Sequence, residues 1–250
     1  MKLYLLGVMI AGACGFSPTV RFEQTDARPQ GSGDDSGISA AACHVTDPAL
    51  RLCLDFEDMP LVPTVHDLAN HHDGSADNVA SVPRGNERAA GFVSDTLTGL
   101  GSQIVIAETP DLDIPDHVTY EMYLAVAGVP QNNVWPLDNY GEYGVKLTND
   151  AITCYAGGAF AATTNALTTG WHHVACAYGD GKLRAYVDGQ NVACHTTSGP
   201  IHDNGDGVKI GADYTGAIDD VHIYARTFDS DEIAQRVGMS ATNEVVCKSN

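Results

Sequence analysis

The sequence has few basic residues and no long apolar segment. Lysine and arginine together number 13 against 32 aspartates and glutamates, so the formal net charge is −19 over 250 residues. This balance argues against nucleic-acid binding, which needs a basic surface, and against electrostatic attachment to anionic lipid. No segment is long and apolar enough to span a bilayer as a permanent helix. The acidic excess fits solubility outside the cell, or carboxylates that hold a hard cation such as calcium.

Several catalytic patterns are also missing. No two cysteines have the C-x-x-C spacing of a zinc site or a redox motif. Neither a nucleophile elbow nor a phosphate-cradling glycine loop is present. What the chain does have is the composition of a globular domain, with 44% hydrophobic residues and 26 glycines. So many glycines indicate numerous tight turns, as all-β folds require.

The N-terminus resembles the signal of a bacterial lipoprotein. An apolar run over residues 3–10 is followed by small residues at 11–13 and then by Cys14. The resemblance implies that residues 1–13 are removed and that Cys14 is lipidated, as the only attachment to a membrane. Ala11 stands where that motif usually has leucine, and the alternative is ordinary secretion with Cys14 lost or left free. The expected location is the cell envelope, lipid-anchored at the surface or outer membrane, or otherwise outside the cell.

The segment that follows has no periodic apolar pattern. Residues 28–37 are rich in glycine, serine and aspartate, a composition that cannot bury a core. We therefore expect a flexible tether over residues 14–42 and one folded domain over residues 43–250.

The cysteine count supports a lipidated Cys14. There are seven cysteines, and an odd number in an exported chain leaves one thiol to explain. If Cys14 carries lipid, the others remain for disulfides, which form by default in an oxidising compartment. Sequence alone does not choose among the possible pairings. The preferred pairs are Cys43–Cys53 as a local clip, Cys154–Cys176 between two strands, and Cys194–Cys247 by elimination.

Alternating apolar residues predict half-buried strands through the rest of the chain. Leu52, Leu54 and Phe56 share one face, and residues 118–126 and 183–187 alternate in the same way. Period two with one apolar face indicates antiparallel sheets. Short strands at regular spacing, joined by glycine turns, suggest a sandwich or a barrel.

One helix is expected near the C-terminus. Asp229 followed by Glu232 has the spacing of a capping box, and Ile233 and Val237 supply an apolar face. Gly238 marks the expected end of this helix.

Five blocks follow one another along the second half of the chain: WHHVA at 171–175, LRAYVDG at 183–189, KIG at 209–211, TGAIDDVHIY at 215–224 and DSDEI at 229–233. Together they resemble the laminin-G-like, concanavalin A-like jelly-roll family. Residues 52–57 and 67–74 look like the family's opening strand and its aspartate-rich loop, so the resemblance covers about residues 49–237. It implies an all-β, antiparallel two-sheet jelly-roll sandwich with one short C-terminal helix. It says little about function, because this fold carries lectins, glycoside hydrolases, adhesion modules and spacers.

The resemblance also implies a position for a structural calcium ion. Related jelly rolls often hold calcium where the first and last strands meet, and the candidates here are Glu57, Asp58 and Asp219. Asp219 shares a predicted face with Val221 and Ile223, so it points inward and must be paired, hydrogen-bonded or bound to a metal. The alternative is that Asp219 accepts backbone hydrogen bonds from a loop. Calcium wants six to eight oxygen ligands.

Exposed aromatic residues are the candidates for ligand binding. A sugar site uses flat rings together with polar side chains for the hydroxyl groups. Trp135, Tyr140 and Tyr143 lie in a region that resembles a loop, and Tyr214 lies just before the last strand. The same rings would serve equally as anchors for a protein partner or as simple packing. Trp171 is expected in the core.

Catalysis has less support in the sequence. The glycan-cleaving members of the fold carry Glu-x-Asp-x-Glu on one strand, and this motif is absent. Asp55 and Glu57 share a strand face but do not match the catalytic strand, so no catalytic residue is assigned. His172 and His173 are adjacent, and adjacent residues on a strand point to opposite faces, so the two do not form a natural metal-binding pair. His173 is expected to be a packed structural histidine.

These features predict a surface-tethered, non-catalytic module that binds a glycan or an extracellular protein. The alternatives are a glycan-active hydrolase of the same fold and a structural envelope lipoprotein without a small ligand.

Overall fold

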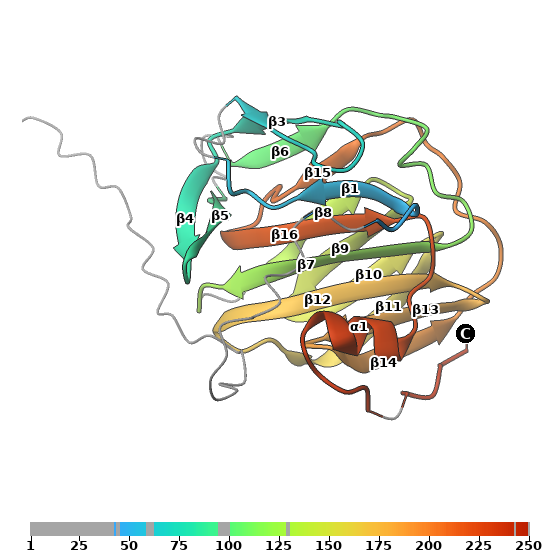
Figure 1. Cartoon of the computed structure of the whole chain (residues 1–250). Helices are drawn as coiled ribbons and strands as arrows, with labels where there is room; N and C mark the ends of the chain where they lie inside the picture. Colours follow the sequence, from blue (N-terminus) through green and yellow to red (C-terminus); the bar gives the residue numbers. More distant parts are fainter. Residues whose placement is uncertain are drawn as a thin grey trace, which may run out of the picture.

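The computed structural model describes residue 43 and residues 46–58, 63–94, 101–128, 131–242 and 244–249. The predicted signal (1–13) and tether (14–42), including Cys14, lie outside these described residues. The described chain forms two antiparallel sheets and one short helix, as Figure 1 shows. The predicted all-β sandwich is therefore confirmed.

The first sheet holds the longest strands. Its order is β14 (Gln190–Thr196), β13 (Lys182–Val187), β12 (Gly170–Gly179), β7 (Val118–Val126), β16 (Gly216–Tyr224), β5 (Glu87–Phe92) and β4 (Ala80–Arg84), and β1 (Leu50–Leu54) also pairs with β16. β5 pairs with the start of β16 and β1 with its end.

The second sheet packs against the first. Its order is β11 (Ala159–Ala166), β10 (Ala151–Ala156), β9 (Tyr143–Thr148), β8 (Asn132–Asn139), β15 (Val208–Ile210), β6 (Gln103–Ile106), β3 (Gly74–Asp77) and β2 (Thr64–Val65).

Alternation along the strands builds the core between the sheets. On β7, Tyr120, Met122 and Leu124 are fully buried in this core, and on β1 Leu52 and Leu54 join them. Burying one large apolar side chain contributes roughly 1.5–3 kcal/mol. The predicted inward faces of these strands are therefore confirmed, and their other faces point away from the core.

Three disulfides have the predicted pairing: Cys43–Cys53, Cys154–Cys176 and Cys194–Cys247. Cys154 lies on β10 and Cys176 on β12, so the second bridge joins the two sheets through the core. The third ties the C-terminal segment to the edge strand β14, where Lys248 also accepts a hydrogen bond from Thr196.

A β-bulge in β16 changes the predicted direction of Asp219. The register with β7 shifts between Asp219 and His222, and Asp220 has a left-handed φ of 49°. Asp219 lies opposite Tyr123 on the outer face, whereas Val221 belongs to the core. The prediction that Asp219 shares the inward face of Val221 is therefore wrong, because the bulge inserts one residue and reverses the alternation.

The helix α1 (Ser230–Arg236) covers part of the outer face of the first sheet (Figure 1). Its predicted capping box is present, since Asp229 accepts from the Glu232 backbone and Glu232 accepts from the Asp229 backbone. Gly238 follows with a left-handed φ of 69°, as expected for a helix stop. In the part of the chain that the structure describes, no helix has the length and apolarity needed to cross a membrane.

Candidate functional site

Two of the predicted ligand-binding rings are in the core. Tyr143 and Tyr214 are both 0% exposed. The Tyr143 hydroxyl donates to the carbonyl of Leu112 at 2.8 Å, and the Tyr214 hydroxyl donates to the carbonyl of Ala125 at 2.6 Å. Neither ring faces solvent, so the prediction of ligand binding is wrong for both. Backbone carbonyls inside the sandwich satisfy the hydroxyl groups, which removes the need for a solvent-facing position.

The other two predicted aromatics face solvent on or beside the second sheet. Tyr140, in the turn between β8 and β9, is 63% exposed. Trp135 is half-buried and belongs to β8 rather than to a loop. Its indole meets the ring of Tyr155 edge to face, with centroids 6.2 Å apart, and the ammonium of Lys146 lies 5.4 Å from the indole centroid.

Tyr155 extends this contact into an aromatic strip, defined here as Trp135, Tyr155 and Phe160. Tyr155 and Phe160 are direct partners in the β10–β11 pair, and their ring centroids lie 4.8 Å apart. Phe160 is 51% exposed. The Tyr155 hydroxyl donates to the carbonyl of Gly141 at 3.0 Å, which fixes the ring beside the Tyr140 turn. The strip crosses β8 to β11 on the face that points away from the core.

A groove adjoins the Phe160 end of the strip. It encloses about 690 Å³, and its lining includes Gly157, Gly158 and Phe160 from the β10–β11 hairpin. The facing wall is polar, with His195 and Thr196 at the end of β14 and Thr197 and Ser198 after it. Hydroxyl groups and backbone beside an exposed ring are the groups that bind a polyhydroxylated ligand. We call this cavity the Phe160 groove.

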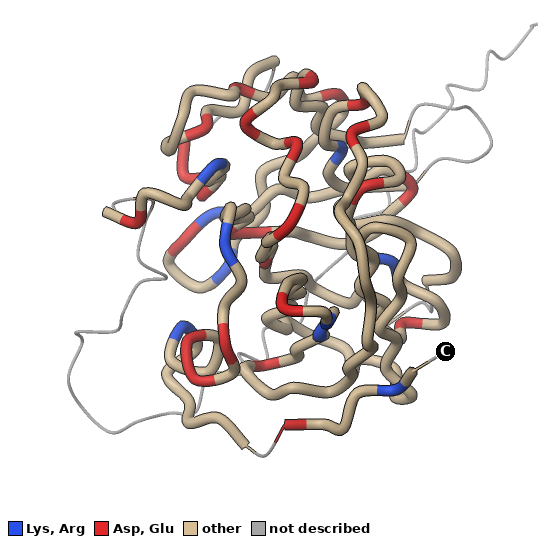
Figure 2. Tube along the Cα trace, turned by 90° about the vertical axis from the view of Figure 1, so that its right-hand side faces the viewer, with Lys and Arg blue, Asp and Glu red and all other residues tan. Residues whose placement is uncertain are grey.

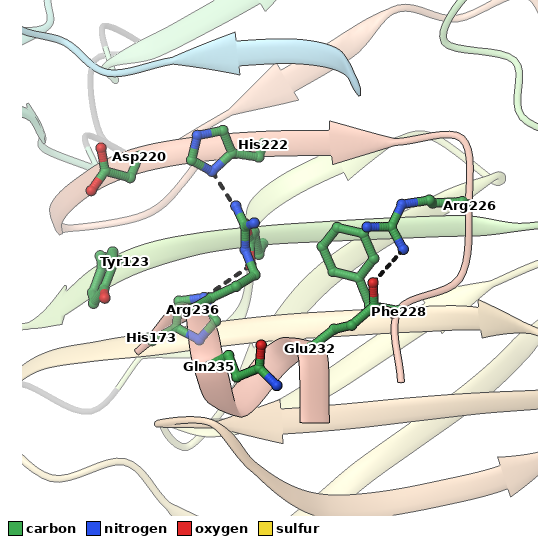
Figure 3. A pocket seen from close by; sticks show the side chains of 10 residues that line it. Tyr123, His173, Asp220, His222, Arg226, Phe228, Glu232, Gln235 and Arg236 are labelled. Atoms are coloured by element: carbon green, nitrogen blue, oxygen red, sulfur yellow. Dashed lines mark hydrogen bonds and ion pairs between the residues drawn. The ribbon is translucent and has the colours of Figure 1, made fainter. Parts of the chain in front are cut away.

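A second, smaller cavity of about 290 Å³ lies between α1 and the outer face of the first sheet (Figure 3). Its centre is Glu121 on β7, which is 2% exposed. His173 Nε2 donates to Glu121 Oε2 at 3.1 Å, His222 Nδ1 lies 3.3 Å from Oε1, and Arg236 Nε donates to Oε1 at 2.6 Å. Figure 3 shows Arg236 reaching from α1 toward the strands between His222 and His173. We call this set the Glu121 cluster.

The electrostatics of the Glu121 cluster are those of a structural network. Burial alone would raise the pKa of Glu121, but hydrogen bonds from His173 and His222 and the charge of Arg236 hold the pKa well below its usual range. At the rim of the cavity Arg226 is paired with Asp47 and Glu232. The charges in the cavity thus have partners from the protein, and His173 is packed and hydrogen-bonded, as expected.

Asp219 has a cationic partner beside this cavity. Arg84 Nη1 lies 2.8 Å from a carboxylate oxygen of Asp219 and 2.8 Å from one of Asp220, and its guanidinium stacks 3.8 Å from the Tyr123 centroid. Burial and the neighbouring carboxylate raise the pKa of Asp219, and Arg84 opposes this rise. Glu87 completes a group of acids here, and the Arg84 guanidinium supplies positive charge to it.

The predicted calcium ligands do not come together. Phe56 has a left-handed φ of 55° after β1 ends, and Glu57 accepts a hydrogen bond from the backbone N–H of Arg88 at 2.8 Å. Asp58 is exposed. Within the described ranges, no group of three ligand-competent side chains contains Glu57 or Asp58. The trio of Glu57, Asp58 and Asp219 is therefore wrong as a ligand set, because the chain turns away and Asp219 pairs with arginine.

A different group of acids converges at one end of the sandwich. Ligand atoms of Glu108, Asp113 and Asp203 all lie within 4.8 Å of one another. Beside them Glu142, which is 0% exposed, has its pKa raised to about 7 by burial and by the charges of these three carboxylates. Figure 2 views this side of the molecule, where acidic positions outnumber basic ones. We call Glu108, Asp113, Glu142 and Asp203 the acid cluster.

The two-sheet sandwich is the fold of the concanavalin A-like proteins, and the sequence comparison agrees. Residues 98–234 match the family model of the concanavalin A-like lectin/glucanases superfamily. This is more than half of the chain, so the chain belongs to this laminin-G-like family of the superfamily. No curated protein sequence matches the chain.

Solved structures share the fold at low sequence identity. The binding domain of botulinum neurotoxin DC, in complex with rat synaptotagmin II, is 10% identical with a TM-score of 0.60 and matches 76% of this chain and 51% of its own. Domain 4 of AbnA, an extracellular arabinanase from Geobacillus stearothermophilus in complex with arabinotriose, is 13% identical with a TM-score of 0.59, over 75% and 98% of the two chains. The sialidase of Trypanosoma rangeli is 16% identical with a TM-score of 0.54, over 74% and 32%.

These similarities concern the fold alone. The present chain spans about half the length of the toxin binding domain, and it matches only a third of the sialidase. The description of the toxin structure calls it a binding domain, and that of the AbnA structure calls it the fourth domain of an arabinanase.

Proposed function

We propose that the chain is a non-catalytic module that binds a glycan along the aromatic strip and in the Phe160 groove. The observation that carries the proposal is the Tyr155–Phe160 pair, two rings 4.8 Å apart on the outer face of the second sheet, with Phe160 51% exposed. A flat sheet that presents adjacent rings offers an apolar platform to the C–H face of a sugar. The polar wall of the groove then offers partners to the hydroxyl groups.

Similar structures support this choice without deciding it. The AbnA domain was solved with arabinotriose, which is a glycan. The botulinum neurotoxin domain was solved with synaptotagmin, which is a protein. A protein partner is therefore the main alternative. We favour a glycan because the rings on the second sheet continue into a groove lined by hydroxyls and glycines rather than into a broad apolar surface.

A hydrolase is the second alternative, and the acid cluster is its strongest candidate for catalysis. The raised pKa of Glu142 is the property expected of a general acid. Glu142 is 0% exposed, however, so its carboxyl cannot reach a glycosidic oxygen in this conformation. Asp55 and Glu57, the acid pair considered from the sequence, are also poor candidates for catalysis, because Asp55 accepts a hydrogen bond from the Glu57 backbone in a turn. Both observations favour binding over cleavage.

The surface location of the module is part of the proposal. A lipid on Cys14 would hold the domain outside the membrane, and the disulfides fit an oxidising compartment. The test is detergent-phase partition of the full-length chain made in a bacterial host, beside Cys14→Ser. We expect the wild type in the detergent phase and the variant in the aqueous phase. An aqueous wild type would contradict lipid anchoring and leave secretion.

The test of glycan binding is an array of immobilised glycans probed with the oxidised protein, once in calcium and once in chelator. We expect binding to a restricted group of glycans, and loss of these signals in Phe160→Ala. A blank array in both conditions would overturn the glycan proposal in favour of a protein partner. Release of reducing sugar from a bound glycan would instead favour the hydrolase.

A further inference from the structure

We propose that the segment after α1 forms one wall of the Phe160 groove, and that the disulfide between Cys194 and Cys247 holds it there. We call this segment the strap, and its described residues are 240–242 and 244–249. Ser249 of the strap lines the groove, and Cys247 is a positioning residue for it. The inference rests on the glycan function proposed above, because it concerns the same groove.

The strap runs along β14, the edge strand of the first sheet (Figure 1). At the start of this strand Gln190 Nε2 donates to the Ser240 carbonyl, and Gln190 Oε1 accepts from the Thr242 N–H, both at 3.2 Å. Further along, the Val245 N–H donates to Asn191 Oδ1 at 2.9 Å. The strap therefore covers the edge of β14, where a strand otherwise presents unpaired backbone groups.

The far end of the strap is fixed by a covalent bond and by backbone pairing. Cys247 forms the disulfide with Cys194. Beside it the Lys248 N–H donates to the Cys194 carbonyl at 3.0 Å, and the Thr196 N–H donates to the Lys248 carbonyl at 2.8 Å. Ser249 follows directly and lines the groove. The register of these bonds thus sets the position of Ser249.

The remaining attachments of the strap are weak. None of its described residues belongs to the buried apolar clusters, and Val245 and Val246 are 38% and 87% exposed. The hydrogen bonds at the start of the strap are exposed, so water competes for their donors and acceptors. Glu244 accepts from Ser230 at 3.2 Å and lies 3.8 Å from Arg184, with its own side chain half exposed. The disulfide is therefore the strongest attachment of the strap.

An attached strap favours ligand binding because the groove is ordered beforehand. Ser249 adds a hydroxyl and backbone groups to the polar wall that follows β14. With the disulfide closed, these groups are in place before a ligand arrives. Without it, the strap would have to be ordered on binding, and that loss of conformational entropy lowers the affinity. The disulfide thus serves ligand affinity as well as stability.

Hydrogen exchange of the Lys248 amide in the full chain tests the attachment without a ligand. We expect exchange at least about tenfold faster in the double variant Cys194→Ser/Cys247→Ser than in wild type. The control is Cys43→Ser/Cys53→Ser, which removes the bridge at the other end of the chain and should leave this amide protected. Unchanged protection in the first variant would overturn the claim that the disulfide holds the strap.

Calorimetric titration of the strongest array glycan into the same proteins tests the role in binding. We expect at least about tenfold weaker binding by Cys194→Ser/Cys247→Ser and unchanged affinity in the control, with both variants folded. Unchanged affinity in the first variant, while wild type binds, would overturn the strap's role and leave the glycan function intact. A blank array would instead overturn the glycan function, and hydrogen exchange would still decide whether the disulfide holds the strap.

A bulky side chain at Ser249 gives a test that leaves the disulfide intact. Ser249→Phe would fill part of the groove and is expected to weaken glycan binding at least about tenfold. Val246→Phe is the matched control, because Val246 belongs to the strap, is 87% exposed and does not line the groove. The control should bind like wild type. Unchanged affinity in Ser249→Phe would contradict a place for the strap in the site.

Discussion

Arg236 on the only helix of the described chain forms an ion pair with Glu121 on the central strand β7, with 2.6 Å between Arg236 Nε and Glu121 Oε1. The same guanidinium donates to the Tyr224 hydroxyl at 2.8 Å. One side chain thus links α1 to both β7 and β16. This link adds to the apolar packing of Ile233 with Ala175 and Tyr224, a second buried cluster that lies on the outer face of the sheet beneath the seven-residue helix.

Removing this link should destabilise the domain. Arg236→Met leaves the Glu121 carboxylate buried without its strongest cation, and we expect the free energy of unfolding to fall by roughly 3 kcal/mol. Urea unfolding measures the change. Arg184→Met is the control, because Arg184 pairs at 3.8 Å with Glu244, which is half exposed, and such pairs contribute roughly 1 kcal/mol or less. Equal losses in the two variants would contradict a special role for Arg236.

The lowered pKa of Glu121 also predicts that the stability of the fold decreases at acid pH. Its pKa in the fold lies well below the ordinary value of 4.5. The carboxylate therefore stabilises the fold fully above pH 4.5, and this contribution is lost as the pH falls through the depressed pKa. Urea unfolding between about pH 3 and pH 7 should show a smaller advantage of wild type over Glu121→Gln at the acid end. An advantage that does not change with pH would count against this account.

The raised pKa of His172 predicts the opposite dependence of stability on pH. Burial would lower its pKa, but the hydrogen bond with Asp188 at 2.8 Å, the charge of Asp188 and the Thr168 carbonyl raise it above 6.5. The pair stabilises the fold fully below pH 6.5, and the contribution is lost as the pH rises through the raised pKa. The Tm difference between wild type and His172→Gln should shrink from about pH 6 to about pH 9. His202→Gln, at an exposed position, should show no such trend.

The disulfide between the two sheets should stabilise the fold by more than its local packing alone would. Cys154 and Cys176 are separated by 22 residues and join β10 to β12. Replacing both with alanine is expected to lower the free energy of unfolding by about 3 kcal/mol through the freedom returned to the unfolded chain. Denaturation by urea under oxidising conditions measures it. A loss below about 1 kcal/mol would indicate that the bridge does little beyond filling space.

Local sequence patterns predicted the strands and the helix, because each pattern depends only on residues that are neighbours in the sequence. The alternation of Leu52 and Leu54 sets a strand face, and Asp229 with Glu232 caps a helix within one turn. The sequence indicates the aromatic strip less clearly. In β10 the buried Ile152 and Cys154 alternate with Tyr155, so an outward ring was readable, but its partner Phe160 becomes apparent only once the hairpin register is known.

Features that depend on distant residues or on irregular backbone were not predictable. The bulge at Asp220 reverses the direction of Asp219, and no residue pattern announces it. Glu108 and Asp203 are nearly a hundred positions apart in the sequence, and only the packing of two loops brings them together. The burial of Tyr143 likewise rests on a carbonyl from a distant loop.

The most direct test of the glycan proposal is calorimetric titration of the strongest array glycan into wild type, Phe160→Ala and Val192→Ala. Val192 is an exposed apolar residue on β14, in the other sheet, and serves as the matched control. The account predicts equal affinity for wild type and Val192→Ala and at least about tenfold weaker binding by Phe160→Ala, with all three proteins folded. Unchanged affinity in Phe160→Ala would contradict binding at the aromatic strip.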